Sequence, residues 1–442
     1  MKNNIDVTKG VIWKQVIIFF IPIVIGGFFQ HLYAIVDAII VGKGLGTLEL
    51  SAVGGSASKL IVMITNFFIG VSSGITAYVS RYYGKKDFKM LKSITFNGVI
   101  MFAVLGILLS AIGIVFSNRF LNLLQTPVET MDLSNTYLKT YLFGIVFSIL
   151  YNAFAGILRA LGDSKRPLYV LIFCSFLNIV LDILFALVLR MGVFGVAFAT
   201  VISQTISAII LARIIVKEIN ISMKQKVNID FRIMRDIGAI GIPAGLQSMM
   251  FSLSNMVVQG AVNTFGAVSV AAWTVYVRVD SIVDILVTSL GNTVITFVGQ
   301  NYGADKLHRV KQSVKQIMVI SYVIVAAVIV AFMLTRYSLF SLFTNDIAVT
   351  NISISLIFVI MPMYLLTIPQ QVFSQALRGL GKSFIPMILT LVGVVGTRLL
   401  WVNFVLPIKP SLTLLGACYP ASALLMSIIF AVYYKRVLAK IA

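Results

Sequence analysis

The sequence predicts an all-α polytopic membrane protein with twelve transmembrane helices in two pseudo-symmetric six-helix bundles. Three observations support this fold class: the apolar composition, a series of long apolar runs, and a second half that repeats the first. The chain has 442 residues, 59% hydrophobic and 11% charged, and its mean hydropathy is +1.00. Soluble proteins have about 45–50% apolar and about 25% charged residues. The composition therefore excludes a soluble globular protein, and it is too apolar for a disordered chain.

The long apolar runs define the expected membrane spans. A helix that crosses a bilayer needs about 20 mostly apolar residues. Twelve such stretches lie near residues 15–41, 48–80, 92–116, 134–158, 167–189, 192–216, 235–262, 267–299, 312–334, 350–376, 384–406 and 412–434. The first is too long for a signal sequence, so we expect it to be retained. A polar stretch at the midpoint predicts an N-lobe of residues 1–216, a cytoplasmic linker of 217–234 and a C-lobe of 235–442.

The two halves of the chain match each other at a nearly constant offset. The segment Leu158–Ser164 reads LRALGDS and falls on Leu377–Ser383, which reads LRGLGKS, while Pro22 falls on Pro243. Because each half contains six helices, an even number, both halves cross the membrane in the same direction. Parallel repeats of this kind are known from transporters.

The excess of basic residues predicts the orientation of the helices. The chain has 35 Lys and Arg residues against 15 Asp and Glu, a net charge of +20. In a soluble protein this balance would suggest nucleic-acid binding. Here most of the basic residues fall on the side that holds both termini, and positive residues gather on the cytoplasmic side. We therefore expect a multi-pass protein of the cell membrane that contacts the lipid bilayer, with cytoplasmic termini and no nucleic-acid partner.

The few cysteine and histidine residues argue against a metal centre or a disulfide framework. There are two of each, and they are scattered along the chain, which is too few for either kind of site. No motif of nucleotide-binding or hydrolytic enzymes stands in a strand–turn–helix context. We therefore expect neither an enzyme nor a bound cofactor.

Carboxylates inside the spans of the first half are the strongest functional signal. An Asp in the middle of a transmembrane helix costs about 2.5–3.5 kcal/mol, so such residues usually face a bundle interior or a water-filled cavity. Asp37 lies in the first span, after Pro22, which should kink that helix. Asn178 and Asp182 share one face of the fifth span because they are four residues apart. Other polar residues of these spans are Gln30, Asn152, Thr200 and Gln204.

Oxygen ligands of this kind suit a hard cation such as Na⁺, by analogy with Ca²⁺ and Mg²⁺. They equally suit protons, because two nearby carboxylates repel each other when both are ionised. The second half differs, since Asp37 aligns with a Val and Asp182 with a Trp. It has Asp280 and Asp284 in the eighth span and Arg398 in the eleventh instead. Two interpretations of these residues are open. Arg398 could form a buried structural ion pair with one of the aspartates, or the residues could have a functional role.

Taken together, these features resemble the multidrug and toxic compound extrusion (MATE) family. The resemblance covers the whole chain: the twelve helices, Pro22 with Asp37, and the repeated LRxLGxS motif. It implies a V-shaped fold of two lobes. The first half resembles the cation site of the family's DinF-like and related bacterial branches. Carried over, the residues that bind Na⁺ or take up protons are Asp37, Asn178, Asp182 and Thr200, with the Val196 carbonyl. Gln30 and Asn152 match polar positions that line that lobe.

The sequence departs from the NorM-like branch, which uses acidic residues in the seventh and tenth helices. The corresponding runs here, Gly245–Asn255 and Tyr364–Gln371, contain no acid. A cation site of that type is therefore not expected in the C-lobe. Asp280 and Asp284 could take part of its role or bind a cationic substrate.

The resemblance implies a secondary active antiporter that works by alternating access. It would export organic cations, other drugs or toxic metabolites, small amphiphilic molecules in general, in exchange for H⁺ or Na⁺. Cation binding at Asp37 and Asp182 would bend the first helix at Pro22 and expel the substrate, and we expect a monomer. One alternative is a flippase for lipids or lipid-linked precursors, but such proteins often have further helices and a strongly cationic cavity. The other is a passive channel, but no selectivity filter or acidic ring is present.

Overall fold

The computed structural model describes residues 5–219 and 228–441, and every regular element in these ranges is a helix. Eleven of the helices within them are long and apolar enough to cross a membrane, or twelve if the bent pair α12–α13 forms one span. The predicted all-α fold of a multi-pass membrane protein is therefore confirmed. Three of the basic residues on the side expected to be cytoplasmic, Lys2, Lys224 and Lys226, lie outside the described residues, as does the middle of the expected linker.

The chain divides into two compact units by its internal packing. Unit 1 comprises Met1–Asp6 and Ile21–Gly245, and unit 2 comprises Val7–Phe20 and Leu246–Ala442. These bounds differ from the expected lobes at two places. The first part of helix α1 belongs to unit 2, and the first part of helix α8 belongs to unit 1. The chain therefore passes between the units inside both helices, close to Pro22 and Pro243.

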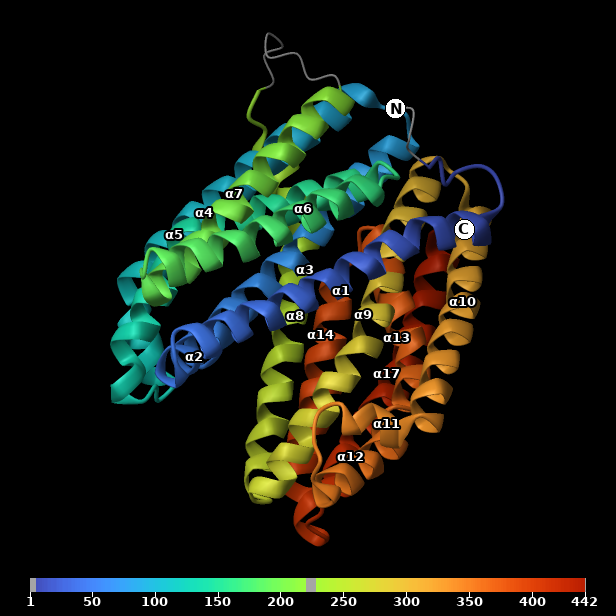
Figure 1. Cartoon of the computed structure of the whole chain (residues 1–442). Helices are drawn as coiled ribbons and strands as arrows, with labels where there is room; N and C mark the ends of the chain where they lie inside the picture. Colours follow the sequence, from blue (N-terminus) through green and yellow to red (C-terminus); the bar gives the residue numbers. More distant parts are fainter. Residues whose placement is uncertain (1–4, 220–227, 442) are drawn as a thin grey trace. The chain divides into compact units, whose positions relative to one another are not determined.

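Unit 1 is built around helix α5, which packs against α3, α4 and α7 (Figure 1). Its core contains large buried side chains such as Phe102, Leu138 and Ile149. The elements of this unit are α1 (Ile12–Gly44, from Ile21), α2 (Thr47–Gly54), α3 (Ser56–Gly84), α4 (Phe88–Leu123), α5 (Val128–Ala160), α6 (Lys165–Asp182), η1 (Ile183–Val188), α7 (Gly192–Glu218) and the start of α8 (Phe231–Asn263).

Unit 2 is built around helices α9 and α13, which pack against each other. Helix α13 also packs against α17, and α9 also packs against α10 and α12. The further elements of this unit are α9 (Ala267–Gly303), α10 (Leu307–Leu334), α11 (Arg336–Ser341), α12 (Ile347–Ile360), α13 (Met363–Gly379), α14 (Phe384–Thr390), η2 (Leu391–Gly396), α15 (Thr397–Leu400), η3 (Trp401–Val405), η4 (Leu406–Ile408), α16 (Leu412–Gly416) and α17 (Cys418–Ile441).

Facing glycines explain why the start of α8 belongs to unit 1. Gly70 and Gly74 of α3 lie against Gly241 and Gly245 of α8, one helical turn apart on each side. A Cβ atom at Gly74 would stand 2.6 Å from the Ile237 carbonyl oxygen and 2.7 Å from the Gly241 Cα. Small residues four apart let transmembrane helices approach this closely. The two helices therefore meet backbone to backbone, and no larger residue fits at these positions.

Backbone contacts explain why the start of α1 belongs to unit 2. Arg309 of α10 donates to the carbonyl oxygens of Val7 at 3.0 Å and Gly10 at 2.9 Å, and Asn301 of α9 donates to Val7 at 3.2 Å. Val7 itself is fully buried. These side chains satisfy backbone acceptors that precede the helix, which would otherwise lack partners.

The spans are interrupted at positions that hydropathy does not reveal. The tenth expected span bends by 47° between α12 and α13, at Pro362, because proline removes a helical hydrogen bond. The π-helix η1 begins directly after Asp182, and η3 begins at Trp401, the residue that the internal repeat aligns with Asp182. Inserted π-turns often mark functional sites in helices.

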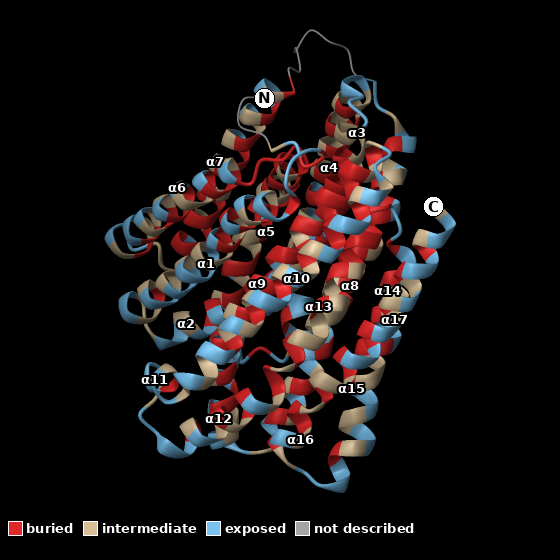
Figure 2. Cartoon of the chain, turned by 90° about the vertical axis from the view of Figure 1, so that its right-hand side faces the viewer, coloured by how far each residue is buried: buried red, intermediate tan, exposed pale blue. Residues whose placement is uncertain are grey.

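The outer faces of the helices are apolar. On α4, Val104, Ile107, Leu108 and Val115 are all about half exposed or more. Figure 2 shows exposed and buried positions on opposite sides of the same helices. Exposed apolar stripes of this length suit contact with lipid chains rather than water.

Candidate functional site

The candidate site of unit 1 is positioned by the end of helix α6. Asn178 and Asp182 lie on its last turn, 3% and 0% exposed. The α-helical hydrogen-bond pattern ends at Asp182, where η1 takes over. Both side chains are therefore held inside the helix bundle, where a lone charged group is costly.

Asp37 and Asp182 come together although they lie far apart in the sequence. The carboxyl group of Asp37, on α1, lies within hydrogen-bonding reach of the Asp182 carboxyl group. Among the described residues, no donor reaches either Asp182 oxygen or Asp37 Oδ1. Two ionised carboxylates only accept hydrogen bonds. The described residues therefore leave the acceptor oxygens of this pair without hydrogen-bond partners.

Asn178, Thr200 and Val196 form a second connected group. The Asn178 amide donates to Thr200 Oγ1 at 3.5 Å, and the Thr200 hydroxyl donates to the Val196 carbonyl oxygen at 3.1 Å. Asn178 shares a face of α6 with Asp182, so it links this group to the carboxylates. The five residues named above for the cation site thus gather in one region of unit 1.

Two tyrosines near the carboxylates were missed by the sequence reasoning. Tyr33 and Tyr137 both interact electrostatically with Asp37 and Asp182. The spacing of Tyr33 and Asp37, four residues on one helix, is a signal that could have revealed the first. Tyr137 lies on α5, and no local pattern connects it with the site.

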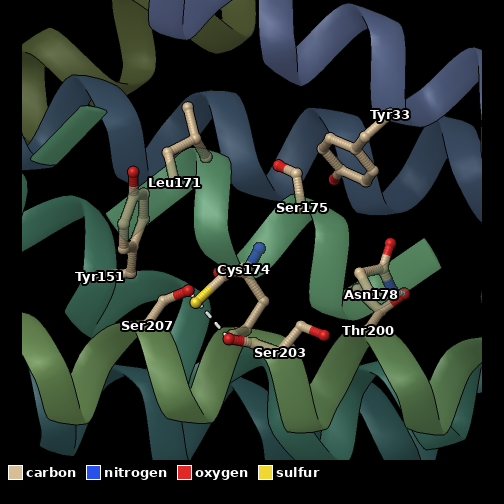
Figure 3. A pocket seen from close by; sticks show the side chains of 10 residues that line it. Tyr33, Tyr151, Leu171, Cys174, Ser175, Asn178, Thr200, Ser203 and Ser207 are labelled. Carbon is tan, nitrogen blue, oxygen red and sulfur yellow. Dashed lines mark hydrogen bonds between the residues drawn. The ribbon is translucent and has the colours of Figure 1, made fainter. Parts of the chain in front are cut away.

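A small cavity borders the site between α6 and α7 (Figure 3). Its volume is about 20 Å³, which is room for about one water molecule. Tyr33 and Asn178 line one end and Tyr151 and Ser207 the other. The remaining lining residues are Leu171, Cys174, Ser175, Thr200, Ser203 and Gln204.

The three further polar residues expected in this half do not all reach the cavity. Gln204 lines it, and no partner within the described part of the chain reaches its Oε1 atom. Gln30 is exposed and is not among the lining residues. Asn152 donates to the Ser148 carbonyl oxygen of its own helix at 2.9 Å and is likewise outside the lining.

In unit 2, Asp280 is held by two phenols rather than by a basic residue. The hydroxyl groups of Tyr276 and Tyr364 donate to its two carboxylate oxygens at 2.7 Å and 3.0 Å. Asp284, one turn further on α9, is exposed. These hydrogen bonds stabilise the carboxylate, and the charge of Arg398 adds a favourable interaction at longer range.

Arg398 forms no ion pair with these aspartates. Its guanidinium donates to Asn255 Oδ1 at 2.7 Å and Ser254 Oγ at 3.2 Å, and it stacks 4.1 Å from the ring centre of Tyr419. Between the described residues, no ion pair within 4.0 Å joins it to Asp280 or Asp284. The structural ion pair considered from the sequence is therefore wrong, because neutral oxygens and an aromatic face satisfy the guanidinium instead.

The two repeats are also visible in a comparison with known proteins. The sequence profile named MatE matches residues 22–184 and 243–402. The chain belongs to the MatE family. This MatE chain is 28% identical over 444 residues to the probable multidrug resistance protein YoeA of Bacillus subtilis, covering 98% of the chain and 96% of the relative. It is 33% identical over 309 residues to the probable multidrug resistance protein YpnP of the same organism, covering 69% and 68%.

Solved structures support the MatE fold. A transporter of the MOP superfamily from Pyrococcus furiosus has a TM-score of 0.90 to this chain at 22% identity, covering 99% of the chain and 98% of that structure. The family, the fold and membrane transport as the type of activity therefore agree with the sequence-based predictions.

Proposed function

We propose that this MatE transporter is a secondary antiporter that exports small amphiphilic molecules, chiefly organic cations, in exchange for H⁺ or Na⁺. The observation that carries the proposal is the pairing of Asp37 and Asp182. Both Asp182 oxygens lack a hydrogen-bond donor among the described residues, and the two carboxyl groups lie within hydrogen-bonding reach of each other. Such a pair binds a cation more strongly than either carboxylate alone.

The place of Asp37 in the chain suggests how cation binding drives transport. Asp37 lies on the part of α1 that belongs to unit 1, while Val7–Phe20 of the same helix belongs to unit 2. A cation that draws Asp37 toward Asp182 therefore acts on a helix that both units share. Pro22 lies beside the crossing point and weakens the helix there. Bending at this point would couple cation binding to exchange between two states.

The expected substrates are organic cations and related amphiphiles. The relatives YoeA and YpnP both bear the description "probable multidrug resistance protein". In the spans expected from the sequence, the acids Asp37, Asp182, Asp280 and Asp284 outnumber the bases Lys59, Arg278 and Arg398 by one. An acidic interior favours positively charged substrates. We expect a monomer in the cell membrane with both termini in the cytoplasm, and no covalent chemistry.

Within the described part of the chain, the surroundings of Arg398 do not favour the flippase alternative. A protein that moves anionic lipid precursors needs basic groups free to bind phosphate. Arg398 is instead engaged by Asn255, Ser254 and the ring of Tyr419.

Transport by purified protein in vesicles tests the proposal. Ethidium movement is measured with an imposed pH gradient and, separately, with a Na⁺ gradient, so that the driving ion is identified. Asp37→Asn should reduce driven ethidium movement to the level of protein-free vesicles, because the pair no longer binds a cation. Asp132→Asn, at an exposed position of α5, is the matched control and should transport normally. Full driven transport by Asp37→Asn would overturn the proposed site.

A further inference from the structure

A continuous row of polar side chains leads away from the carboxylate pair between helices α6 and α7. We call it the α6–α7 seam, formed by Cys174, Ser175 and Asn178 of α6 and Thr200, Ser203 and Ser207 of α7. The spacings of three and four residues place each set on one helix face. Figure 3 shows Asn178 and Thr200 at one end of the seam and Ser207 at the other. The seam therefore runs along the helices and not only around Asp182.

Three residues that line the cavity in this seam have acceptor oxygens without donors. Asn178 Oδ1, Ser203 Oγ and Gln204 Oε1 have no hydrogen-bond partner among the described residues, and Asn178 and Ser203 are 3% and 4% exposed. Leaving buried acceptors unpaired is costly. The amide oxygens of Asn178 and Gln204 only accept hydrogen bonds, so a donor or a cation is the partner that would satisfy them.

We propose that this cavity is a second binding site for the coupling cation, called the second station below. It would bind Na⁺ or hydronium through neutral oxygens. The proposal rests on the function proposed above and adds a site to it. The ligands are Asn178 Oδ1, Ser203 Oγ and Gln204 Oε1, while Asp37 and Asp182 form the first station. A volume of about 20 Å³ fits a single ion or water-sized species.

A neutral second station has a clear physical purpose. Conduction and release require several sites, each weak enough for the ion to leave. A cation that leaves two carboxylates directly for an apolar bundle would meet a high barrier. Neutral oxygens would lower that barrier by solvating the cation after it leaves the carboxylates. Asn178 belongs both to the first site and to the cavity, so it would connect the two.

The seam leads toward the end of the bundle expected to face the cytoplasm. Helix α6 begins at Lys165 and α7 ends at Glu218, and Arg166 Nη1 lies 2.7 Å from Glu218 Oε2 across these ends. Between Ser207 and Glu218, the buried residues of α7 include Leu211 and Ile215. Apolar side chains and an ion pair therefore follow the seam along the helices toward that end. The cation would wait there until these helix ends separate.

Conservative substitutions at the second station provide the first test. Ser203→Ala and Gln204→Met each remove one oxygen ligand and leave both carboxylates in place. We expect the cation concentration for half-maximal transport to stay within about twofold, while turnover falls about tenfold, the equivalent of about 1.4 kcal/mol. Thr205→Val is the matched control on α7, because its hydroxyl donates to the Val201 carbonyl oxygen of the same helix at 2.7 Å. It should transport at the normal rate.

Silver ions provide the second test, because Ag⁺ is a small monovalent cation that reacts with thiols. Cys174 lines the cavity, and the only other cysteine in the sequence is Cys418. In a Cys418→Ala background and nitrate buffers, Ag⁺ should block transport, and Cys174→Ser should restore it. Protection by Na⁺ identifies Na⁺ as the occupant, whereas protection by acid alone identifies a proton carried by water.

The second station would be overturned if Ser203→Ala and Gln204→Met kept wild-type turnover and if neither Na⁺ nor acid protected Cys174 against Ag⁺. The cavity would then hold a structural water only. The same result with inactive Asp37→Asn would leave the proposed function standing. Active Asp37→Asn and Asp182→Asn variants would overturn the proposed function itself.

Discussion

The carboxyl groups of Asp37 and Asp182 face each other inside unit 1, although one lies on α1 and the other at the end of α6. No donor among the described residues reaches either Asp182 oxygen. Helix packing therefore brings two acidic side chains together, with Asp182 fully buried and Asp37 half-buried. We propose that a cation or proton completes this arrangement.

Cation binding should stabilise the purified protein. A ligand present at 100 times its dissociation constant adds about 2.7 kcal/mol to the free energy of unfolding. The melting temperature in detergent should rise when Na⁺ is titrated, or when the pH is lowered, whichever matches the coupling ion. Asp182→Asn should lose this response, because it retains only one carboxylate. A wild-type protein that responds to neither ion would contradict the site.

The two carboxylates should act as one unit. Asp37→Asn and Asp182→Asn should each abolish cation-driven ethidium transport, and the double variant should be no worse than either. Residues that work together show this kind of strong non-additivity. Rates in vesicles under an imposed cation gradient measure it. Partial losses that multiply in the double variant would show that the aspartates act independently.

The facing glycines of α3 and α8 should not accept even one methyl group. Gly74→Ala would place its Cβ 2.6 Å from the Ile237 carbonyl oxygen, and such overpacking costs about 1–3 kcal/mol. The melting temperature and the yield of monodisperse protein should fall. Gly260→Ala, on α8 with no atom within 4 Å of the new Cβ, is the control. Equal stability of the two variants would contradict the close helix contact.

Asp280 should influence the choice of substrate by its charge. Asp280→Asn should raise the ethidium concentration for half-maximal transport and leave that of an uncharged substrate unchanged. Tyr364→Phe removes one hydrogen bond to Asp280 but keeps the charge, so it should preserve the preference for cations. Competition assays with both substrate types measure this difference. Equal effects of Asp280→Asn on both substrates would assign Asp280 a structural role.

Arg398 should require its planar guanidinium and not only its charge. Lysine cannot reproduce both the stacking on Tyr419 and the hydrogen bonds to Asn255 and Ser254. Arg398→Lys should therefore lower the free energy of unfolding by about 1–3 kcal/mol, because the buried Ser254 hydroxyl loses its donor and the stacking on Tyr419 is lost. Arg278→Lys, at an exposed position of α9, should have little effect. Thermal unfolding in detergent compares the two variants.

Local patterns predicted the helices well, because each membrane span satisfies its backbone hydrogen bonds internally and needs about 20 apolar residues. The same patterns did not show where spans break, as at Pro362 and after Asp182. A π-turn depends on neighbouring helices as well as on local sequence. The lobe boundaries were placed at the linker, whereas the units change inside α1 and α8, because facing glycines and the Arg309 contacts act over long sequence distances.

The sequence by itself determined the membrane fold, the repeat and the residue types of a cation site: Asp37, Asn178, Asp182 and Thr200. Polar and charged side chains are energetically unfavourable inside a membrane, so their presence in the spans indicated a functional site. Only the tertiary structure decided that Asp37 meets Asp182, that Tyr33 and Tyr137 stand beside them, and that Arg398 pairs with Asn255 and Tyr419 instead of an aspartate. Hydropathy measures the transfer of one segment into lipid. Which side chains meet depends on how several helices pack, and no single segment contains that information.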